Sequence, residues 1–465
     1  MELLYCREIL SATGGILISG KMEDTISNIS TDTRQIAGGD FFIPIAGERF
    51  DGHDFIADAF REGASGCLTH RDLEGLDVPM EGRIIIRVED TARALRDLAS
   101  YYRSKFNIPV VGITGSVGKT STKEMIACVL ARKYNVLKTS RNLNNEIGLP
   151  LTVFNLNSSH EIAVFEMGMS ALGEISRLTA IAKPSIAVIS NIGISHIEKL
   201  GSKNNILKAK MEILEGLSDD GIVILNGDDD LLLGLKGLLR FRTIYYGMGE
   251  GMDYQAYNIR TGEKGTFFEI FLGNKEYTVE IKVPGVHNVY NALAAISTGM
   301  VMGIPPEDII EGIAMFRSGD MRLDIKEYNG IKVINDVYNA SPDSMQAALR
   351  VLKDVSAERR IAVLGDMLEL GRWSEEAHRS VGRFAALCNP DYVIAVGNYS
   401  SFIIEGAREN IKGKMETFAL KNNEEAIELI SSVIKAGDAV LVKGSRGMRM
   451  ERIVERIKEL SNKQD

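Results

Sequence analysis

A glycine-rich loop between an apolar run and a helical pattern carries the clearest chemistry in the sequence. Residues 110–121 read VVGITGSVGKTS. Glycines let the backbone turn tightly and direct its N–H groups at phosphate oxygens, and the N-terminus of the following helix adds a partial positive charge. In such loops the lysine, here Lys119, reaches the β- and γ-phosphates, and the hydroxyl of the next residue, Thr120, binds Mg²⁺.

The loop departs from the general G-x-x-x-x-G-K-[ST] pattern, because Ile113 stands where the first glycine is expected. It matches the shorter T-G-x-x-G-K-T form instead. The alternative interpretation is a glycine turn that only links a strand to a helix. The context favours a nucleoside triphosphate site, and we predict that it consists of Thr114, Gly115, Ser116, Val117, Gly118, Lys119, Thr120 and Ser121.

Two polar side chains follow later apolar runs at the points where predicted strands end. Glu166 follows Ile162–Phe165, and His196 comes shortly after Ile186–Ser190. Doubly wound sheets bind ligands at the carboxyl ends of their strands. A carboxylate suits Mg²⁺ beside a triphosphate, whereas an imidazole suits it less well and suggests a second metal position. We predict that Glu166 and His196 are catalytic and metal-binding residues.

Lys210 lies on the apolar side of a predicted helix over Asn204–Leu217. At about 100° per residue, Ile206, Ile213 and Leu214 flank it, so a solvated position does not explain this lysine. Burial lowers the pKa of an ammonium group and permits a neutral, nucleophilic amine. The alternative is that the side chain extends past the apolar rim to water.

The elements around these residues predict an α/β fold. Strands expected at Pro109–Thr114, Ile162–Phe165, Ile186–Ser190 and Ile222–Leu225 alternate with helical patterns such as Lys119–Ala131, as in a doubly wound parallel sheet. A second α/β unit has expected strands at Arg360–Leu364, Tyr392–Val396 and Ala439–Val442, with helices from about Ser374 and Arg446. The first hundred residues carry short strand-like pieces, at Phe41–Ile45 and Ile84–Val88.

Length and composition fit three domains in an ordinary globular protein. The 465 residues suggest about three domains, and we place them at 1–107, 108–316 and 317–465. The net charge of −9 argues against general nucleic-acid binding. The four cysteines are scattered without CxxC spacing, and the start of the sequence does not resemble a secretory signal. No run of about 18 apolar residues occurs. We therefore predict a cytoplasmic protein without a membrane span.

Further motifs lie along the chain in this order: Ser30–Arg34, Gly39–Phe42, Asp51–His53, Asn142–Pro150, His287–Ala292, Met321–Leu323, Asn335–Met345, Leu364–Gly371 and Lys443–Arg446. Together they resemble the Mur ligase family of ATP-dependent amide-forming enzymes. The resemblance covers essentially the whole chain and implies three α/β domains: a small UDP-binding N-terminal domain, a central P-loop ATPase domain and a C-terminal Rossmann-like domain.

Within the family, the motifs are most similar to the member that joins D-alanyl-D-alanine to UDP-N-acetylmuramoyl-tripeptide through an acyl phosphate. Two positions depart mildly: Asn335 stands where aspartate is commonest, and Ser341 where asparagine is commonest. The sister enzyme that adds the third residue carries D-Y-A-H and D-N-P-R segments. This chain has the Asp336–Asn339 form DVYN and lacks the second segment.

The resemblance also implies site residues, cofactors and partners. ATP and Mg²⁺ are expected, with the metal held by Thr120, Glu166, His196 and Lys210 as a carbamate. A monomer that acts on the two small-molecule substrates is also expected. Asn291 is expected to contact adenine, Arg322 phosphate and Asp336 ribose, with Asn288 beside them. The implied substrate-binding residues are Ser30, Thr31, Asp32, Thr33, Arg34, Asp51, Gly52, His53, Asn142, Asn144, Asn145, Tyr338 and Asn339.

Two kinds of alternative remain open. Another Mur-type ligase, either the third-residue-adding enzyme or a folylpolyglutamate-like ligase, would share the core. The folylpolyglutamate-like ligase would not need the Asp32–Arg34 and Asp51–His53 motifs. A nucleotide-binding switch would use the phosphate loop without forming an amide, and it would not need Lys210, Glu166 and His196.

Overall fold

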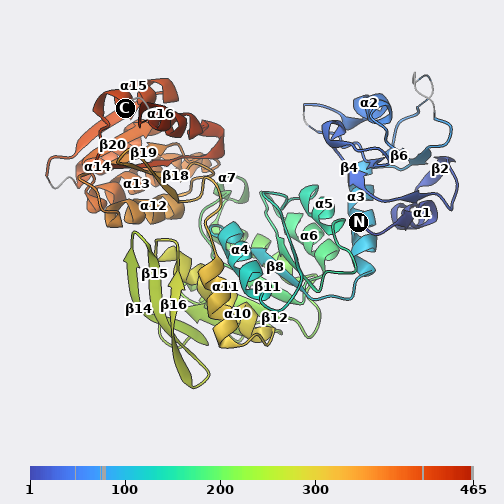
Figure 1. Cartoon of the computed structure of the whole chain (residues 1–465), viewed down its shortest axis with the longest axis horizontal. Coiled ribbons are helices and arrows are strands. Elements are labelled where there is room, and N and C mark those ends of the chain that lie inside the picture. Colours follow the sequence, from blue (N-terminus) through green and yellow to red (C-terminus); the bar gives the residue numbers. More distant parts are fainter. Residues whose placement is uncertain (48, 74, 76–79, 411–412, 462–465) are drawn as a thin grey trace. The chain divides into compact units, whose positions relative to one another are not determined.

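The computed structural model describes residues 1–47, 49–73, 75, 80–410 and 413–461, and the chain forms two compact units (Figure 1). The first unit contains Met1–Thr114, Lys133–Ala187 and Met211–Ile222. The second contains Gly115–Arg132, Val188–Lys210 and Val223 onward. The phosphate loop, Lys210 and His196 therefore belong to the second unit, and Glu166 belongs to the first.

The N-terminal part of the first unit is built on a small five-stranded sheet in the order β2-β7-β6-β5-β4. Its only antiparallel pair among the described strands is β2 with β7. The predicted strand Phe41–Ile45 is shorter than expected, because Pro44 has no N–H to donate to a ladder. The strands are β2 (Ile16–Ser19), β4 (Ile29–Ser30), β5 (Phe41–Phe42), β6 (Gly66–Thr69) and β7 (Ile84–Arg87), with helices α1 (Cys6–Thr13), α2 (Ile56–Arg61) and α3 (Thr91–Ser104).

The remainder of the first unit holds parallel strands, two of which are buried along their whole length. β10 (Ile162–Glu166) pairs with β8 (Val110–Thr114) on one side and with β9 (Val136–Lys138) on the other. Every residue of β8 and β10 is buried, as expected for parallel strands covered on both faces. Glu166 is the last residue of β10. Helices α5 (Gly148–Val153) and α6 (Glu174–Ala182) complete this part.

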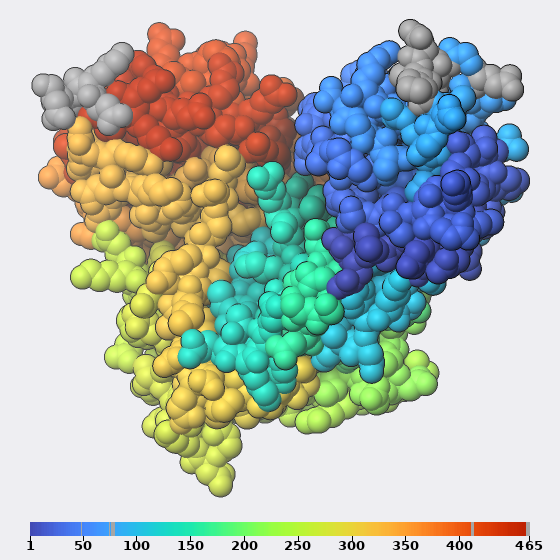
Figure 2. Space-filling model, turned by 45° about the vertical axis from the view of Figure 1, so that its right-hand side comes forward, coloured from blue at the N-terminus to red at the C-terminus, as the bar shows by residue number. Residues whose placement is uncertain are grey.

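In the second unit, helix α4 (Lys119–Leu130) packs against α10 (His287–Val301) and α11 (Pro306–Met315). Strands β13 (Arg242–Gly247), β14 (Tyr254–Gly262), β15 (Gly265–Leu272) and β16 (Lys275–Ile281) lie side by side in that order. The antiparallel hairpins of β14, β15 and β16, which sequence analysis did not identify, form a yellow-green surface at the lower end of this unit in Figure 2.

The C-terminal part of the second unit is a six-stranded sheet in the order β17-β18-β22-β19-β20-β21, parallel except for β17. The three predicted strands are confirmed as β19 (Arg359–Gly365), β20 (Tyr392–Val396) and β22 (Asp438–Lys443). The others are β17 (Asp324–Tyr328), β18 (Ile331–Asp336) and β21 (Glu416–Leu420), with helices α12 (Pro342–Asp354), α13 (Ser374–Cys388), α14 (Ser400–Glu409), α15 (Asn423–Val433) and α16 (Glu451–Ser461).

Two helix predictions are wrong in their bounds. The helix expected from Arg446 is a short 3-10 turn, Arg446–Met448, and α16 begins only at Glu451, because Arg449 adopts a left-handed backbone with φ of 50°. The helix that carries Lys210, α8, spans Lys203–Met211 and continues as a 3-10 turn over Glu212–Leu214. In the part of the chain that the structure describes, no helix combines the length and apolar character needed to span a membrane.

Candidate active site

The phosphate loop spans the residues between β8, which ends at Thr114, and α4, which begins at Lys119. Two glycines make its path possible. Gly115 has φ of +153°, and a Cβ there would lie 1.9 Å from the Ser190 hydroxyl. Gly118 has φ of +84°, and a Cβ there would lie 3.0 Å from Asn291 Oδ1. Side chains at either position would therefore displace the loop.

Asn191, two residues after the end of β11 (Ile186–Ile189), binds this loop through both its backbone and its side chain. Its carbonyl accepts from Ser116 N at 3.1 Å, and its Oδ1 accepts from Val117 N at 2.9 Å. Its Nδ2 donates to Val117 O at 2.9 Å, and that carbonyl also accepts from Ser190 Oγ at 2.8 Å. The sequence prediction missed Asn191, although its position right after a buried strand was a usable signal.

The loop offers a cation and a hydroxyl to an anion. Lys119 Nζ donates to the Gly115 carbonyl at 2.8 Å and lies 3.5 Å from that of Ser116. Ser116 Oγ is buried and makes no hydrogen bond to any residue that the structure describes. A buried hydroxyl without a partner is costly unless a ligand supplies one, and a phosphate oxygen is a suitable acceptor. The residues present therefore fit the predicted nucleotide.

Asn291 and Asn288, which were predicted to face the nucleotide, form a chain of amides to the loop helix. Asn291 Oδ1 accepts from Thr122 Oγ1 at 2.9 Å, and Asn291 Nδ2 donates to Asn288 Oδ1 at 3.1 Å. Asn288 Nδ2 in turn donates to the Pro284 carbonyl at 2.9 Å. These hydrogen bonds connect α10 to α4, the helix that follows the phosphate loop. The adenine contact of Asn291 stays a prediction.

Lys210 is buried, as the apolar stripe predicted. Only 2% of its surface is exposed. Burial holds the pKa of its ammonium group well below the usual range, and the positive charge of Lys119 lowers it further. The side chain therefore does not extend to water, and its burial disfavours the charged form of the amine.

His196 meets a carboxylate that the sequence analysis had placed in a motif but given no role. His196 Nδ1 lies 2.5 Å from Glu369 Oε2, and the contact lowers the pKa of Glu369. The adjacent Ser195 Oγ donates to the Ser116 carbonyl at 3.4 Å, so this segment also contacts the phosphate loop.

In the first unit, Glu166 is buried and contacts one other predicted residue, Asn144. Its Oε1 accepts from Asn144 Nδ2 at 2.8 Å, and its backbone N donates to Thr139 Oγ1 at 3.0 Å. The Asn145 side chain bonds locally: its Oδ1 accepts from Gly148 N at 2.8 Å at the start of α5. Asn142 accepts from Asn144 N through its carbonyl at 2.8 Å.

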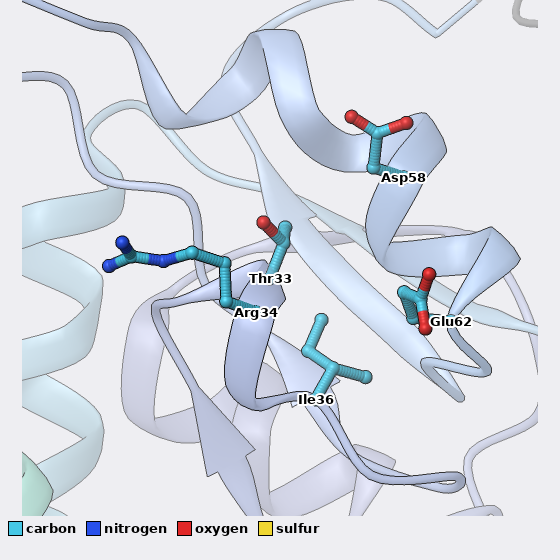
Figure 3. A pocket seen from close by; sticks show the side chains of 5 residues that line it. All are labelled: Thr33, Arg34, Ile36, Asp58 and Glu62. Atoms are coloured by element: carbon cyan, nitrogen blue, oxygen red, sulfur yellow. The ribbon is translucent and has the colours of Figure 1, made fainter.

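The predicted substrate residues Thr33 and Arg34 line a pocket of about 310 Å³ in the first unit (Figure 3). Its other lining residues are Ile36, Asp58 and Glu62. The Arg34 side chain is 86% exposed and points away from the two acids in Figure 3. Asp32 accepts from Arg34 Nη2 at 2.8 Å, which holds the pKa of Asp32 at about 2, and its carbonyl accepts from Ser30 Oγ.

Asp51, His53 and His70 bring three possible metal-ligand atoms within 4.8 Å of one another. The Asp51 and His53 atoms are already engaged: Asp51 Oδ1 accepts from His53 N at 2.9 Å and contacts its Nδ1 at 2.6 Å, while Arg71 pairs with the other oxygen. His70 N donates to His53 Nε2 at 3.4 Å. Asp51 and His53 therefore stabilise this turn, and Gly52 is needed there because a Cβ would lie 2.6 Å from Ile45 N.

The predicted ribose residue Asp336 forms a buried ion pair in the second unit. Lys443 Nζ donates to Asp336 Oδ2 at 2.6 Å and to the Asn339 carbonyl at 2.8 Å. Asp336 Oδ1 accepts from Leu323 N at 3.2 Å. The predicted phosphate residue Arg322 lies over the Tyr338 ring, with its guanidinium carbon 3.9 Å from the ring centroid.

Three family models match consecutive parts of the chain. They are "Mur ligase family, catalytic domain" over residues 25–103, "Mur ligase middle domain" over 113–299 and "Mur ligase, glutamate ligase domain" over 321–446. A curated relative from Bacillus subtilis (strain 168), UDP-N-acetylmuramoyl-tripeptide–D-alanyl-D-alanine ligase, is 42% identical over 96% of this chain and 97% of its own length. The chain belongs to the Mur ligase family.

Other relatives agree with this Mur ligase assignment. The Escherichia coli (strain K12) protein of the same name is 35% identical over 95% of this chain and 97% of its own. The structure of MurF from Acinetobacter baumannii is 31% identical, with a TM-score of 0.90 over 100% of both chains. The MurF ligase from Thermotoga maritima, solved in complex with ADP, has a TM-score of 0.82 at 31% identity over 94% of this chain and 98% of that one.

These findings confirm the family and the α/β fold class predicted from the sequence. A folylpolyglutamate synthase from Mycobacterium tuberculosis, at 15% identity and a TM-score of 0.61, shares the fold alone. The bounds of the three domains and the roles of the individual site residues in this Mur ligase stay predictions.

Proposed function

We propose that this Mur ligase joins D-alanyl-D-alanine to UDP-N-acetylmuramoyl-tripeptide, converting ATP to ADP and phosphate and forming UDP-N-acetylmuramoyl-pentapeptide. The observation that carries the proposal is the 42% identity, over nearly the whole of both chains, to the Bacillus subtilis ligase named for that reaction. The phosphate loop with Lys119 and the buried Ser116 hydroxyl supplies the nucleotide site that the reaction needs.

The chemistry must convert a poor electrophile into a good one. A peptide carboxylate oxygen attacks the γ-phosphorus, the bond to the ADP oxygen breaks, and an acyl phosphate forms. The dipeptide amine then attacks the acyl carbon, loses a proton and releases inorganic phosphate. The carboxylate and the triphosphate repel each other, so the Lys119 ammonium and the loop N–H groups lower the barrier by stabilising negative charge.

The donors predicted for Mg²⁺ fit a hard cation in part. The Thr120 hydroxyl and the Glu166 carboxylate are oxygen donors of the kind that Mg²⁺ prefers, and Asn144 holds that carboxylate in one orientation. His196 is a softer donor, suited to a second position. When bound, the cation would neutralise charge on the β- and γ-phosphates.

We propose, in addition, that Lys210 acts as a carbamate. Burial lowers the pKa of its ammonium group, and the neutral amine attacks CO₂, forming an N–C bond and releasing one proton. The product is an anion that could hold a cation where an ammonium group could not. A Lys210→Ala variant should lose activity and regain part of it with added short carboxylic acids. Full activity in that variant without any additive would exclude the carbamate.

The remaining substrate contacts are proposals drawn from the motifs. Ser30, Thr31, Asp32, Thr33 and Arg34, with Asp51, Gly52 and His53, are assigned to the UDP-sugar. Asn142, Asn144, Asn145, Tyr338 and Asn339 are assigned to the peptide substrates. Asp58 and Glu62 also line the pocket beside Thr33, so a diphosphate would approach from the Arg34 side rather than along α2.

The test is phosphate release from ATP with UDP-N-acetylmuramoyl-tripeptide, with and without D-alanyl-D-alanine. The expected result is release that requires both substrates and yields the pentapeptide product. Release with the tripeptide's precursor and a single amino acid would favour the third-residue-adding enzyme. Nucleotide binding without release for any acid and amine pair would favour a switch.

A further inference from the structure

The loop between β19 and α13 is held firmly by its own part of the fold. The Asp366 carboxylate accepts from the backbone N–H groups of Asn398 at 2.7 Å and Tyr399 at 3.0 Å. Leu368 N donates to Ser445 Oγ at 2.9 Å. Glu369 follows directly, so this loop presents its side chain from a fixed base. The loop ends in the 3-10 turn Gly371–Trp373.

This loop meets the start of helix α7 (Ile197–Leu200) at three points. Glu369 Oε2 lies 2.5 Å from His196 Nδ1, and the Glu369 carbonyl accepts from Glu198 N at 3.3 Å. A Cβ built at Gly371 would lie 2.9 Å from Glu198 Cγ and 3.2 Å from its Cβ. The two segments are therefore in contact through both backbone and side chains.

Both partners of the central contact hold an unusual backbone. His196 has φ of 61° and Glu369 has φ of 63°, in the left-handed region that is unfavourable for residues other than glycine. Such conformations persist where the surroundings fix them, and they concentrate at functional sites. His196 and Glu369 both adopt this conformation and their side chains are in contact, so the rest of the fold must stabilise an unfavourable backbone at both positions.

We propose that Glu369 is a positioning residue for the ligation reaction, holding the His196 ring by its Nδ1 from the loop between β19 and α13. The carboxylate beside Nδ1 restrains the orientation of the imidazole ring, as carboxylates next to functional histidines do. Because Ser195 contacts the Ser116 carbonyl, the contact links the C-terminal sheet to the phosphate loop. This inference rests on the proposed function.

The competing explanation is an ordinary surface ion pair. The Glu369 side chain is 56% exposed, and exposed pairs contribute little to stability. Glu376 is a matched control, because it is a similarly exposed glutamate that pairs with Arg383 on helix α13, away from His196. An ordinary ion pair predicts the same small effect at both positions.

The first experiment compares Glu369→Gln with Glu376→Gln. For Glu369→Gln we expect kcat to fall about tenfold, as for other carboxylates that orient histidines, with the KM for ATP and the thermal midpoint unchanged. Glu376→Gln should match the unaltered enzyme. Glu369→Asp, which keeps the charge, should recover part of the loss. A kcat for Glu369→Gln within twofold of the control overturns the proposal.

The second experiment does not depend on ligation. The Cβ positions of Glu198 and Gly371 are close to disulfide range, so a Glu198→Cys/Gly371→Cys variant should cross-link on mild oxidation, seen as a dithiothreitol-reversible loss of two hydrogens by intact mass. A folded double variant that does not cross-link overturns the proposal. If the unaltered enzyme does not join the two substrates, the proposed function is wrong. Cross-linking between positions 198 and 371 would still show that the two segments are in contact.

Discussion

Removing the Asn191 side chain should loosen the phosphate loop by an amount that the hydrogen bonds allow us to work out. In Asn191→Ala, the Val117 carbonyl keeps its bond from Ser190 Oγ, but Val117 N loses the Oδ1 acceptor at 2.9 Å. Leaving a partly buried N–H without a partner costs about 1–3 kcal/mol. If the loop must be ordered to bind nucleotide, affinity falls by about 5- to 150-fold.

The assay is equilibrium titration with ATP or ADP, followed by calorimetry. Ser190→Ala is the matched control, because it removes the other donor to the Val117 carbonyl and leaves Asn191 in place. We expect its effect on affinity to be clearly smaller. Equal affinities for Asn191→Ala and the unaltered enzyme, or a larger loss in Ser190→Ala, would refute the assignment of Asn191 as the main fastening of the loop.

Three further predictions concern charge, pH and packing. Lys119→Met should weaken nucleotide binding more than tenfold with an unchanged melting curve, and undiminished binding would remove Lys119 from the site. Burial lowers the pKa of His287 from 6.5 to about 4. As pH falls from 6.5 to 4, this histidine therefore becomes protonated in the unfolded chain but stays neutral in the folded chain. Stability should therefore decline over that window by up to about 3 kcal/mol, and urea midpoints for His287→Asn should decline less; parallel curves would contradict this. At Gly406 a Cβ would lie 2.0 Å from the Arg379 carbonyl, so Gly406→Ala should force α13 and α14 apart at a cost of about 1–3 kcal/mol, and an unchanged thermal midpoint would show that the helices adapt freely.

The parts of this molecule that the sequence predicted are those with a local pattern. The glycine loop, the buried parallel strands and the burial of Lys210 all follow from spacing within a dozen residues. The antiparallel strands β14, β15 and β16 were missed. Their inward and outward positions alternate imperfectly, and a register shift interrupts the pairing of β14 with β15 between Tyr257 and Arg260.

Contacts between segments far apart in the sequence could not be predicted from local sequence patterns. The pairing of Thr122 with Asn291 joins residues 169 positions apart, and the contact of His196 with Glu369 depends on two left-handed backbones that no propensity indicates. Asn191 could be placed at a strand end, but not its bonds to Val117, which depend on the direction of single backbone groups. Motif similarity singled out Asn291 as a candidate site residue but did not show that its amide already has partners inside the protein.

The 3-10 turn that follows Glu369 contains Trp373, and the sequence has one tryptophan in all. Its ring is partly buried, with the Arg372 guanidinium 4.1 Å from its centre. Light at the red edge of protein absorption therefore excites one side chain, Trp373, which lies a few residues from the Glu369 carboxylate that contacts His196. The enzyme carries a built-in optical reporter, and its emission can follow that loop through a catalytic cycle without any label.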